Sequence, residues 1–215
     1  CGITTILIGQ VLPFLAERFS LNDLQAGFMF PAQFSGSLIG TFLTSKFGKR
    51  NKFSLATLIG ICLMGLGILG LNLPFELCLV AFFLNGIGVG LTLPSINMLI
   101  YELNPTRASS AVNILNFVWG VGAIICSLTV YSVSKAIGFF PISIVLSAIL
   151  FAIAIGLWLL PSNLEEKPVA TDDDSIDFSV PIWTNPIAWL IAGFNFIHVG
   201  FETSMGGWLP TYTER

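Results

Sequence analysis

Two ionisable residues, His198 and Glu202, lie in the middle of an apolar segment long enough to cross a membrane. They are four residues apart, so on an α-helix they share one face and can touch. A charged side chain in mid-membrane costs at least about 2.5 to 3.5 kcal/mol, which makes both residues functional candidates. Such a pair can take up a proton on one side of a membrane and release it on the other. In the alternative interpretation, Glu202 caps a neighbouring helix or binds a hydroxyl, with His198 as its hydrogen-bonded support.

Uncharged polar residues form a second set of candidates on other apolar segments. Asn113 and Asn116 follow helical spacing with Trp119 alongside, Gln33 lies near mid-depth of an earlier segment, and Asn195 precedes His198 by three residues. Amides both donate and accept hydrogen bonds, and an indole can cover the apolar face of a sugar ring. No buried cation accompanies them, which disfavours a carboxylate or phosphate ligand. These residues predict a site for a neutral sugar or polyol; alternatively, the amides only hold helices together in lipid.

The composition requires that much of the chain faces lipid. Of its 215 residues, 54% are hydrophobic and 10% are charged, whereas about a quarter of a soluble domain is charged. A single core of this size cannot hide so many apolar residues. With nine Lys and Arg, no basic surface for nucleic acid is expected. No nucleophile with a base and no metal-binding spacing such as HExxH occurs, so we expect neither an enzyme nor a cofactor or metal.

Apolar runs of about 20 residues predict seven transmembrane helices. Their predicted ranges are 1–15, 24–45, 53–71, 76–101, 111–133, 142–160 and 186–212. The connectors among the first six are short, which is typical of antiparallel neighbours. Residues 161–185 carry three prolines and the acidic run 172–174, and they predict a solvated linker. The sequence therefore predicts an all-α membrane protein with bundle 1–160, linker 161–185 and a further helix in 186–215.

Lys and Arg in short loops predict the orientation. One set of connectors holds six of them and the other holds three; the sets are Lys46, Lys49, Arg50, Lys52, Arg107 and Lys167 against Arg18, Lys135 and Arg215. The richer set should be cytoplasmic, which places the N-terminus and the 161–185 linker inside the cell. Because the first residue already lies in an apolar run without an initiator Met, we expect a fragment whose first span is truncated.

A short repeat links the two ends of the chain. Leu-Pro and Glu-Arg recur with the same spacing in LPFLAER, which begins at Leu12, and LPTYTER, which begins at Leu209. If the repeat is real, the seventh span is the first helix of a second half with the same orientation, as in many secondary transporters. Alternatively, two helix ends share the same Pro and charge pattern.

The segment SLIGTFLTSKFGKR resembles the loop motif between helices two and three of the major facilitator superfamily. Lys46, Gly48, Lys49 and Arg50 fit that motif, whereas Ser45 stands in place of its usual acid. The resemblance implies a six-helix N-terminal bundle, followed here by one helix of the C-terminal bundle. In physical terms, Gly48 is expected to permit a tight turn, and the bases are expected to hold that turn at the cytoplasmic surface.

The segment HVGFETSMGGWLPTY is similar to the corresponding helix of the fucose, galactose and glucose proton symporters of that superfamily. This resemblance implies proton-coupled uptake of a neutral sugar or polyol by alternating access, with Glu202 as the coupling acid. The expected partners are this ligand, a coupling cation and the lipid bilayer of the plasma or inner membrane, with the protein as a monomer. An exporter of lipophilic compounds shares the fold, but GVGAIICSL lacks the Gly-Pro pair of drug antiporters. A seven-helix receptor would need its N-terminus outside.

Overall fold

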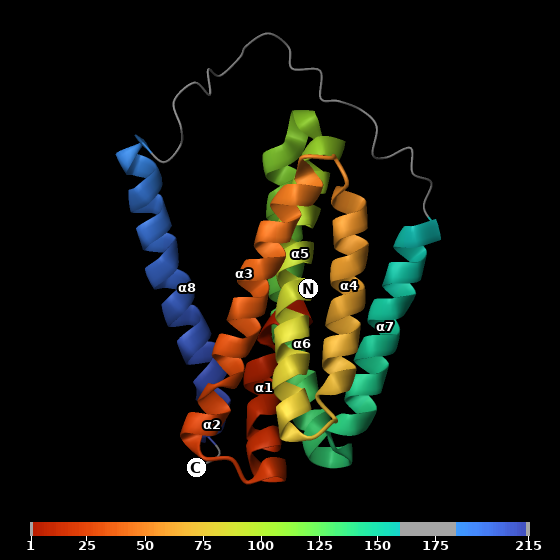
Figure 1. Cartoon of the computed structure of the whole chain (residues 1–215), viewed down its shortest axis with the longest axis vertical. Helices are drawn as coiled ribbons and strands as arrows, with labels where there is room; N and C mark the ends of the chain where they lie inside the picture. Colours follow the sequence, from red (N-terminus) through yellow and green to blue (C-terminus); the bar gives the residue numbers. More distant parts are fainter. Residues whose placement is uncertain (1, 160–183, 214–215) are drawn as a thin grey trace.

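The computed structural model describes residues 2–159 and 184–213, and in these ranges the chain is built from helices (Figure 1). The elements are α1 (Gly2–Phe19), α2 (Asp23–Gly27), α3 (Met29–Gly48), α4 (Phe53–Gly70), α5 (Phe75–Leu103), the 3-10 helix η1 (Pro105–Arg107), α6 (Ala108–Ile137), α7 (Phe139–Leu159) and α8 (Pro186–Thr213). The predicted all-α fold is confirmed. The predicted linker 161–185 lies outside the described residues, apart from its last two positions.

Each predicted span corresponds to a long helix, with one difference near the beginning of the second span. Residues 24–45 were expected to form one helix, but the structure has the short helix α2 before α3. The side chain of Asn22 accepts a hydrogen bond from the Gln25 N–H at 2.8 Å, and Gln25 Oε1 accepts one from the Asn22 N–H at 3.1 Å. This reciprocal cap starts a new helix at Asp23.

By length and composition, four helical segments of the described chain are apolar enough to cross a membrane. They are Phe53–Gly70, Phe75–Leu103, Pro105–Ser134 and Phe139–Leu159. The remaining long helices, α1, α3 and α8, are interrupted by polar residues, among them Gln33 in α3 and His198 and Glu202 in α8. The more polar helices are therefore the ones that carry several of the candidate site residues.

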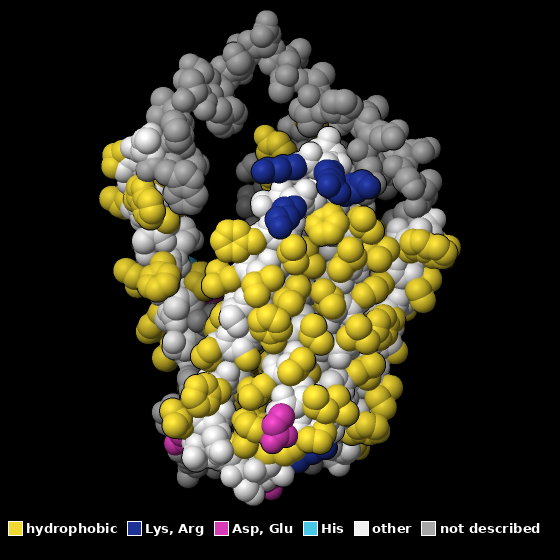
Figure 2. All heavy atoms as spheres, in the orientation of Figure 1, with side chains coloured by type: hydrophobic (Ala, Val, Ile, Leu, Met, Phe, Trp, Pro, Cys, Tyr) yellow, Lys and Arg dark blue, Asp and Glu magenta, His cyan; other side chains and the backbone are white. Residues whose placement is uncertain are grey.

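The surface of the bundle is apolar over most of the face in Figure 2. Large hydrophobic side chains point outward from several helices, including Phe42 of α3, which is 72% exposed, Val80 of α5 and Trp158 of α7. A soluble monomer rarely exposes such a continuous apolar surface. Together with the four apolar helices, this surface identifies a multi-pass membrane protein.

The short connectors separate the cations as the sequence predicts. The α3–α4 and α5–α6 connectors lie at one end of the bundle, together with the end of α7 and the start of α8 (Figure 1). Lys46, Lys49, Arg50 and Arg107 therefore share this end, whereas Arg18 lies at the opposite end. There the Arg18 guanidinium donates a hydrogen bond to the Asn72 carbonyl at 2.8 Å.

Helix α5 is the centre of the bundle and packs closely against α3 and α4. On the α3 side, a Cβ added at Gly86 would overlap the Gln33 carbonyl, and one added at Gly90 would overlap the Ser37 carbonyl. On the α4 side, a Cβ at Gly88 would lie 2.6 Å from the Gly60 carbonyl oxygen. Small residues on α5 therefore let its backbone approach both neighbouring helices closely.

The outer helices are attached by packing and by a few polar contacts. Helix α1 packs on α6, and α7 packs on α4. Ser147 of α7 donates a hydrogen bond to the Gly65 carbonyl at 3.0 Å, and Gln10 of α1 donates one to Ser127 Oγ at 3.3 Å. Helix α8 contacts α1 and diverges from the bundle toward its own N-terminal end (Figure 1).

Candidate functional site

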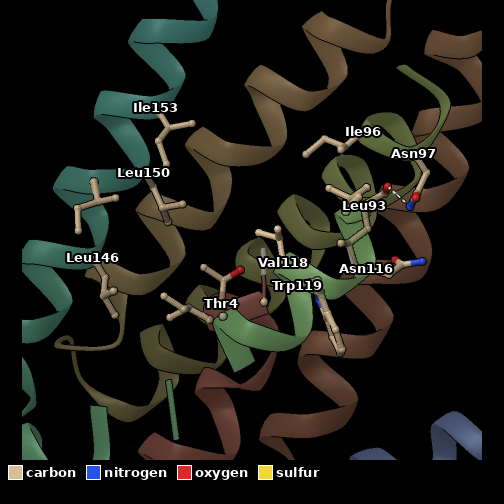
Figure 3. A pocket seen from close by; sticks show the side chains of 15 residues that line it. Thr4, Leu93, Ile96, Asn97, Asn116, Val118, Trp119, Leu146, Leu150 and Ile153 are labelled. Carbon is tan, nitrogen blue, oxygen red and sulfur yellow. Dashed lines mark hydrogen bonds between the residues drawn. The ribbon is translucent and has the colours of Figure 1, made fainter. Parts of the chain in front are cut away.

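A cavity of about 370 Å³ lies between α1, α5, α6 and α7 (Figure 3). Its polar lining residues are Thr4 of α1, Asn97 of α5, and Asn116 and Trp119 of α6. The α7 side is aliphatic, with Leu146, Leu150 and Ile153 along one wall in Figure 3. The lining contains no Lys, Arg, Asp or Glu. The cavity therefore offers hydrogen-bonding groups beside an apolar wall, which is typical of small-molecule sites.

Trp119 is the clearest candidate ligand-binding residue of this cavity. Its indole Nε1 is buried and has no hydrogen-bond partner among the described residues. A buried N–H without an acceptor is costly, so a bound acceptor such as a hydroxyl oxygen would stabilise it. The position of Trp119 is fixed by α1, because the backbone of Gly2 packs directly on the Trp119 carbonyl.

The other α6 candidates differ in their placement. Asn116 lies one turn before Trp119, lines the cavity and is exposed, so its amide is accessible. Asn113 is also exposed but does not line the cavity. Asn97 of α5, which is not among the candidates named from the sequence, lines the cavity and donates a hydrogen bond to the Leu93 carbonyl at 2.8 Å (Figure 3). The structure thus brings together Asn97, Asn116 and Trp119.

Gln33 does not line this cavity. It is 5% exposed, and its Nε2 donates a hydrogen bond to Asn85 Oδ1 of α5 at 3.1 Å. This hydrogen bond lies next to the point where the backbone of Gly86 packs on the Gln33 carbonyl. One amide pair and one small residue therefore join α3 to α5. Of the two interpretations of Gln33, the geometry favours a link between helices.

We expect Gln33→Ala to destabilise the protein by about 1–3 kcal/mol, because it leaves the buried Asn85 amide without its partner. The double variant Gln33→Leu with Asn85→Leu should recover most of that loss, since it removes both polar groups. Thermal unfolding of the two variants measures this difference. A double variant that is stable yet inactive in transport would instead assign a ligand-binding role to the pair.

The predicted proton-coupling residues lie on α8 and are exposed in the described chain. The His198 ring stacks on Phe194, with ring centroids 6.1 Å apart and an interplanar angle of 11°. Asn195 donates a hydrogen bond to the Ile191 carbonyl at 2.9 Å. Over residues 184–213, no hydrogen bond or ion pair joins His198 to Glu202, and neither residue lines the α1–α5–α6–α7 cavity. Their role in coupling stays a prediction.

The α3–α4 connector has a tight turn, but Gly48 is not the residue that adopts the positive φ angle of this turn. Gly48 is the last residue of α3, and the residue with positive φ is Asn51, at 50°. The prediction that Gly48 permits the turn is therefore wrong: Asn, which tolerates this region better than most residues, occupies it. Gly48 instead leaves room for the Phe53 ring, which would lie 3.0 Å from an added Cβ. Lys46, Lys49 and Arg50 are exposed around this turn.

A bundle of apolar helices with a central glycine-packed helix and an uncharged cavity defines an integral membrane protein of the helical-bundle class. The sequence pattern described as "Major Facilitator Superfamily" matches residues 1–215, and the chain belongs to this superfamily. A protein of Caenorhabditis elegans named "Putative transporter svop-1" is 25% identical over 162 residues, which cover 74% of this chain and 31% of that protein. The chain thus matches about a third of the length of this relative. No solved structure matches the present chain.

Proposed function

We propose that the protein of which this chain forms part takes up a neutral sugar or polyol by alternating access, coupled to a cation, most simply a proton. The observation that carries this proposal is the cavity between α1, α5, α6 and α7, with its free indole N–H, two amides and no charged lining residue. Uncharged donors and acceptors beside an apolar wall suit a ligand with hydroxyl groups and an apolar ring face.

The coupling part of the proposal is supported by the two ionisable residues in the middle of α8, His198 and Glu202. Their depth in an otherwise apolar helix is what a proton carrier requires. The resemblance of HVGFETSMGGWLPTY to the fucose, galactose and glucose proton symporters supports the same assignment. Asn195, three residues before His198 on the same helix, is a proposed ligand-binding residue. Asn116 and Trp119 of the cavity, together with the exposed Asn113 of the same helix, complete the proposed ligand-binding set, whereas Gln33 is assigned to the α3–α5 link.

The proposed topology follows from the distribution of cations. The end that carries Lys46, Lys49, Arg50 and Arg107 faces the cytoplasm of a cell or inner membrane, because basic residues are retained on that side. The N-terminal bundle then comprises residues 1–160, the linker 161–185 is cytoplasmic, and residues 186–215 begin a second bundle. We propose that the protein works as a monomer.

Uptake of radiolabelled hexose by cells that express the full-length protein tests this function. We expect accumulation that requires a proton gradient and that falls at least about tenfold in Trp119→Ala, since the ring contacts and the hydrogen bond of such a residue are each worth about 1 kcal/mol or more. Ile125→Ala, an exposed aliphatic position on the same helix, is the matched control. Absence of hexose uptake by the wild type would refute the assignment.

A second candidate, export of lipophilic compounds, is favoured by one observation: the aliphatic α7 wall of the cavity, which includes Leu146, Leu150 and Ile153. An apolar compound would contact this wall without hydrogen bonds to Asn97, Asn116 or Trp119. Dye efflux from loaded cells separates the two candidates. Efflux that depends on the α7 wall but not on Trp119 would favour the exporter.

A further inference from the structure

A second cavity, of about 460 Å³, lies outside the proposed ligand site, at the end of the bundle where α3 turns into α4. Four cations surround it: Lys46, Lys49, Arg50 and Lys52. All four are exposed, and Figure 2 shows dark-blue side chains gathered at this end of the apolar face. The three other lining residues are Leu43, Phe47 and Leu55. We name this set of seven residues the α3–α4 basic pocket.

Among the residues that the structure describes, the cations of this pocket have no acidic partner. Within residues 2–159 no ion pair involves Lys46, Lys49 or Arg50, and the pocket lining contains no Asp or Glu. Ser45, the residue adjacent to Lys46, donates its hydroxyl hydrogen bond to the Phe42 carbonyl at 2.7 Å. Four positive charges held close together without a counter-charge repel one another, so a bound anion would stabilise the turn.

The apolar part of the pocket indicates the kind of anion. Leu43, Phe47 and Leu55 lie on the helices just below the cations, and the lipid-facing surface continues to Phe42 and Ile39, which are 72% and 43% exposed. A phospholipid matches this order of groups, with its phosphate at the cations and its acyl chains on the apolar surface. A free phosphate would use only the charged part. Clusters of four or more Lys and Arg beside a transmembrane helix are typical binding sites for anionic lipids.

We propose that the α3–α4 basic pocket binds the headgroup of an anionic phospholipid, such as phosphatidylglycerol, whose acyl chains lie along α3 and α4. The turn itself is rigid enough to present the cations together. The Arg50 N–H donates to the Phe47 carbonyl at 2.9 Å, and the Lys52 N–H donates to the same carbonyl at 3.1 Å. Binding at this site does not depend on which substrate the protein transports.

The test uses the full-length protein in lipid nanodiscs and measures, by native mass spectrometry, retention of phosphatidylglycerol against phosphatidylcholine. The triple variant Lys49→Gln, Arg50→Gln and Lys52→Gln should weaken the preference for phosphatidylglycerol by about fivefold for each charge removed. Arg107→Gln is the matched control, because Arg107 lies at the same end but does not line the pocket. These residues are exposed, so the variants should keep the wild-type melting temperature.

Each alternative outcome contradicts the proposal. Equal retention of the two lipids by the wild type would show that the pocket has no preference for an anionic headgroup. An unchanged preference in the triple variant would place the lipid elsewhere on the protein. Displacement of phosphatidylglycerol by equimolar glycerophosphoglycerol, which has the headgroup without acyl chains, would assign the site to a soluble phosphate compound instead.

Discussion

Gly86→Ala is expected to destabilise the bundle by more than about 3 kcal/mol, although it adds a single carbon atom. The added Cβ would overlap the Gln33 carbonyl, and two further α3 backbone atoms, Gln33 C and Ser37 N, lie within 3.0 Å of it. Backbone atoms cannot rotate away as a side chain can, so α3 and α5 would have to separate. The separation would also lengthen the buried Gln33–Asn85 hydrogen bond. The melting temperature of the purified full-length protein measures the loss.

Two other glycines give a graded series of controls for this result. At Gly65 an added Cβ would lie 3.1 Å from the Phe151 ring, which can shift by a few tenths of an ångström, so Gly65→Ala should have an intermediate effect. At Gly156 nothing lies within 4 Å, and Ala favours helix by up to about 1 kcal/mol over Gly. Gly156→Ala should therefore be neutral or stabilising. A series in which Gly86→Ala melts at the same temperature as Gly156→Ala would contradict the packing argument.

The helices and the grouping of their ends could be predicted from the sequence because both depend on local patterns. Apolar runs of bilayer length predict helices directly. The cations at Lys49, Arg50 and Arg107 then group the connectors at one end, and the structure confirms this grouping. The start of the separate short helix α2 was missed, even though its signal, Asn22 followed three residues later by Gln25, is present in the sequence.

The contacts of the candidate site could not be predicted from the sequence. They depend on which helices pack against each other and on the relative position of those helices along the bundle axis. Gln33 and Asn85 are separated by 52 positions in the chain, and their pairing follows from the glycine packing of α3 on α5. The amide spacing on α6 predicted a stripe with Asn113 in it, but the cavity includes only Asn116 and Trp119 of that stripe. The participation of Asn97 likewise depends on the angle between α5 and α6.

Glu202→Gln is expected to abolish accumulation of substrate against a gradient while it preserves exchange across the membrane. The amide has nearly the shape of the carboxyl group but cannot take up a proton, so the substrate would equilibrate without a driving force. One co-transported charge at 100 mV supplies about 2.3 kcal/mol, which corresponds to roughly fiftyfold accumulation. We therefore expect the accumulation ratio to fall from tens to about one. Uptake into proteoliposomes with an imposed potential measures this ratio.

The comparison with exchange makes this result specific to coupling. If Glu202→Gln had unfolded the protein or removed substrate binding, counterflow of labelled against unlabelled substrate would be lost as well, whereas a loss of coupling leaves counterflow intact. Glu17→Gln is the matched control, since Glu17 is an exposed carboxyl group at the end of α1 and lies outside the middle of a span.

His198→Gln separates the two interpretations of the pair formed by His198 and Glu202. A proton carrier would lose accumulation with either residue, whereas a His198 that only supports Glu202 would leave accumulation at a reduced rate. Full accumulation in Glu202→Gln would show that the coupling proton binds elsewhere in the protein.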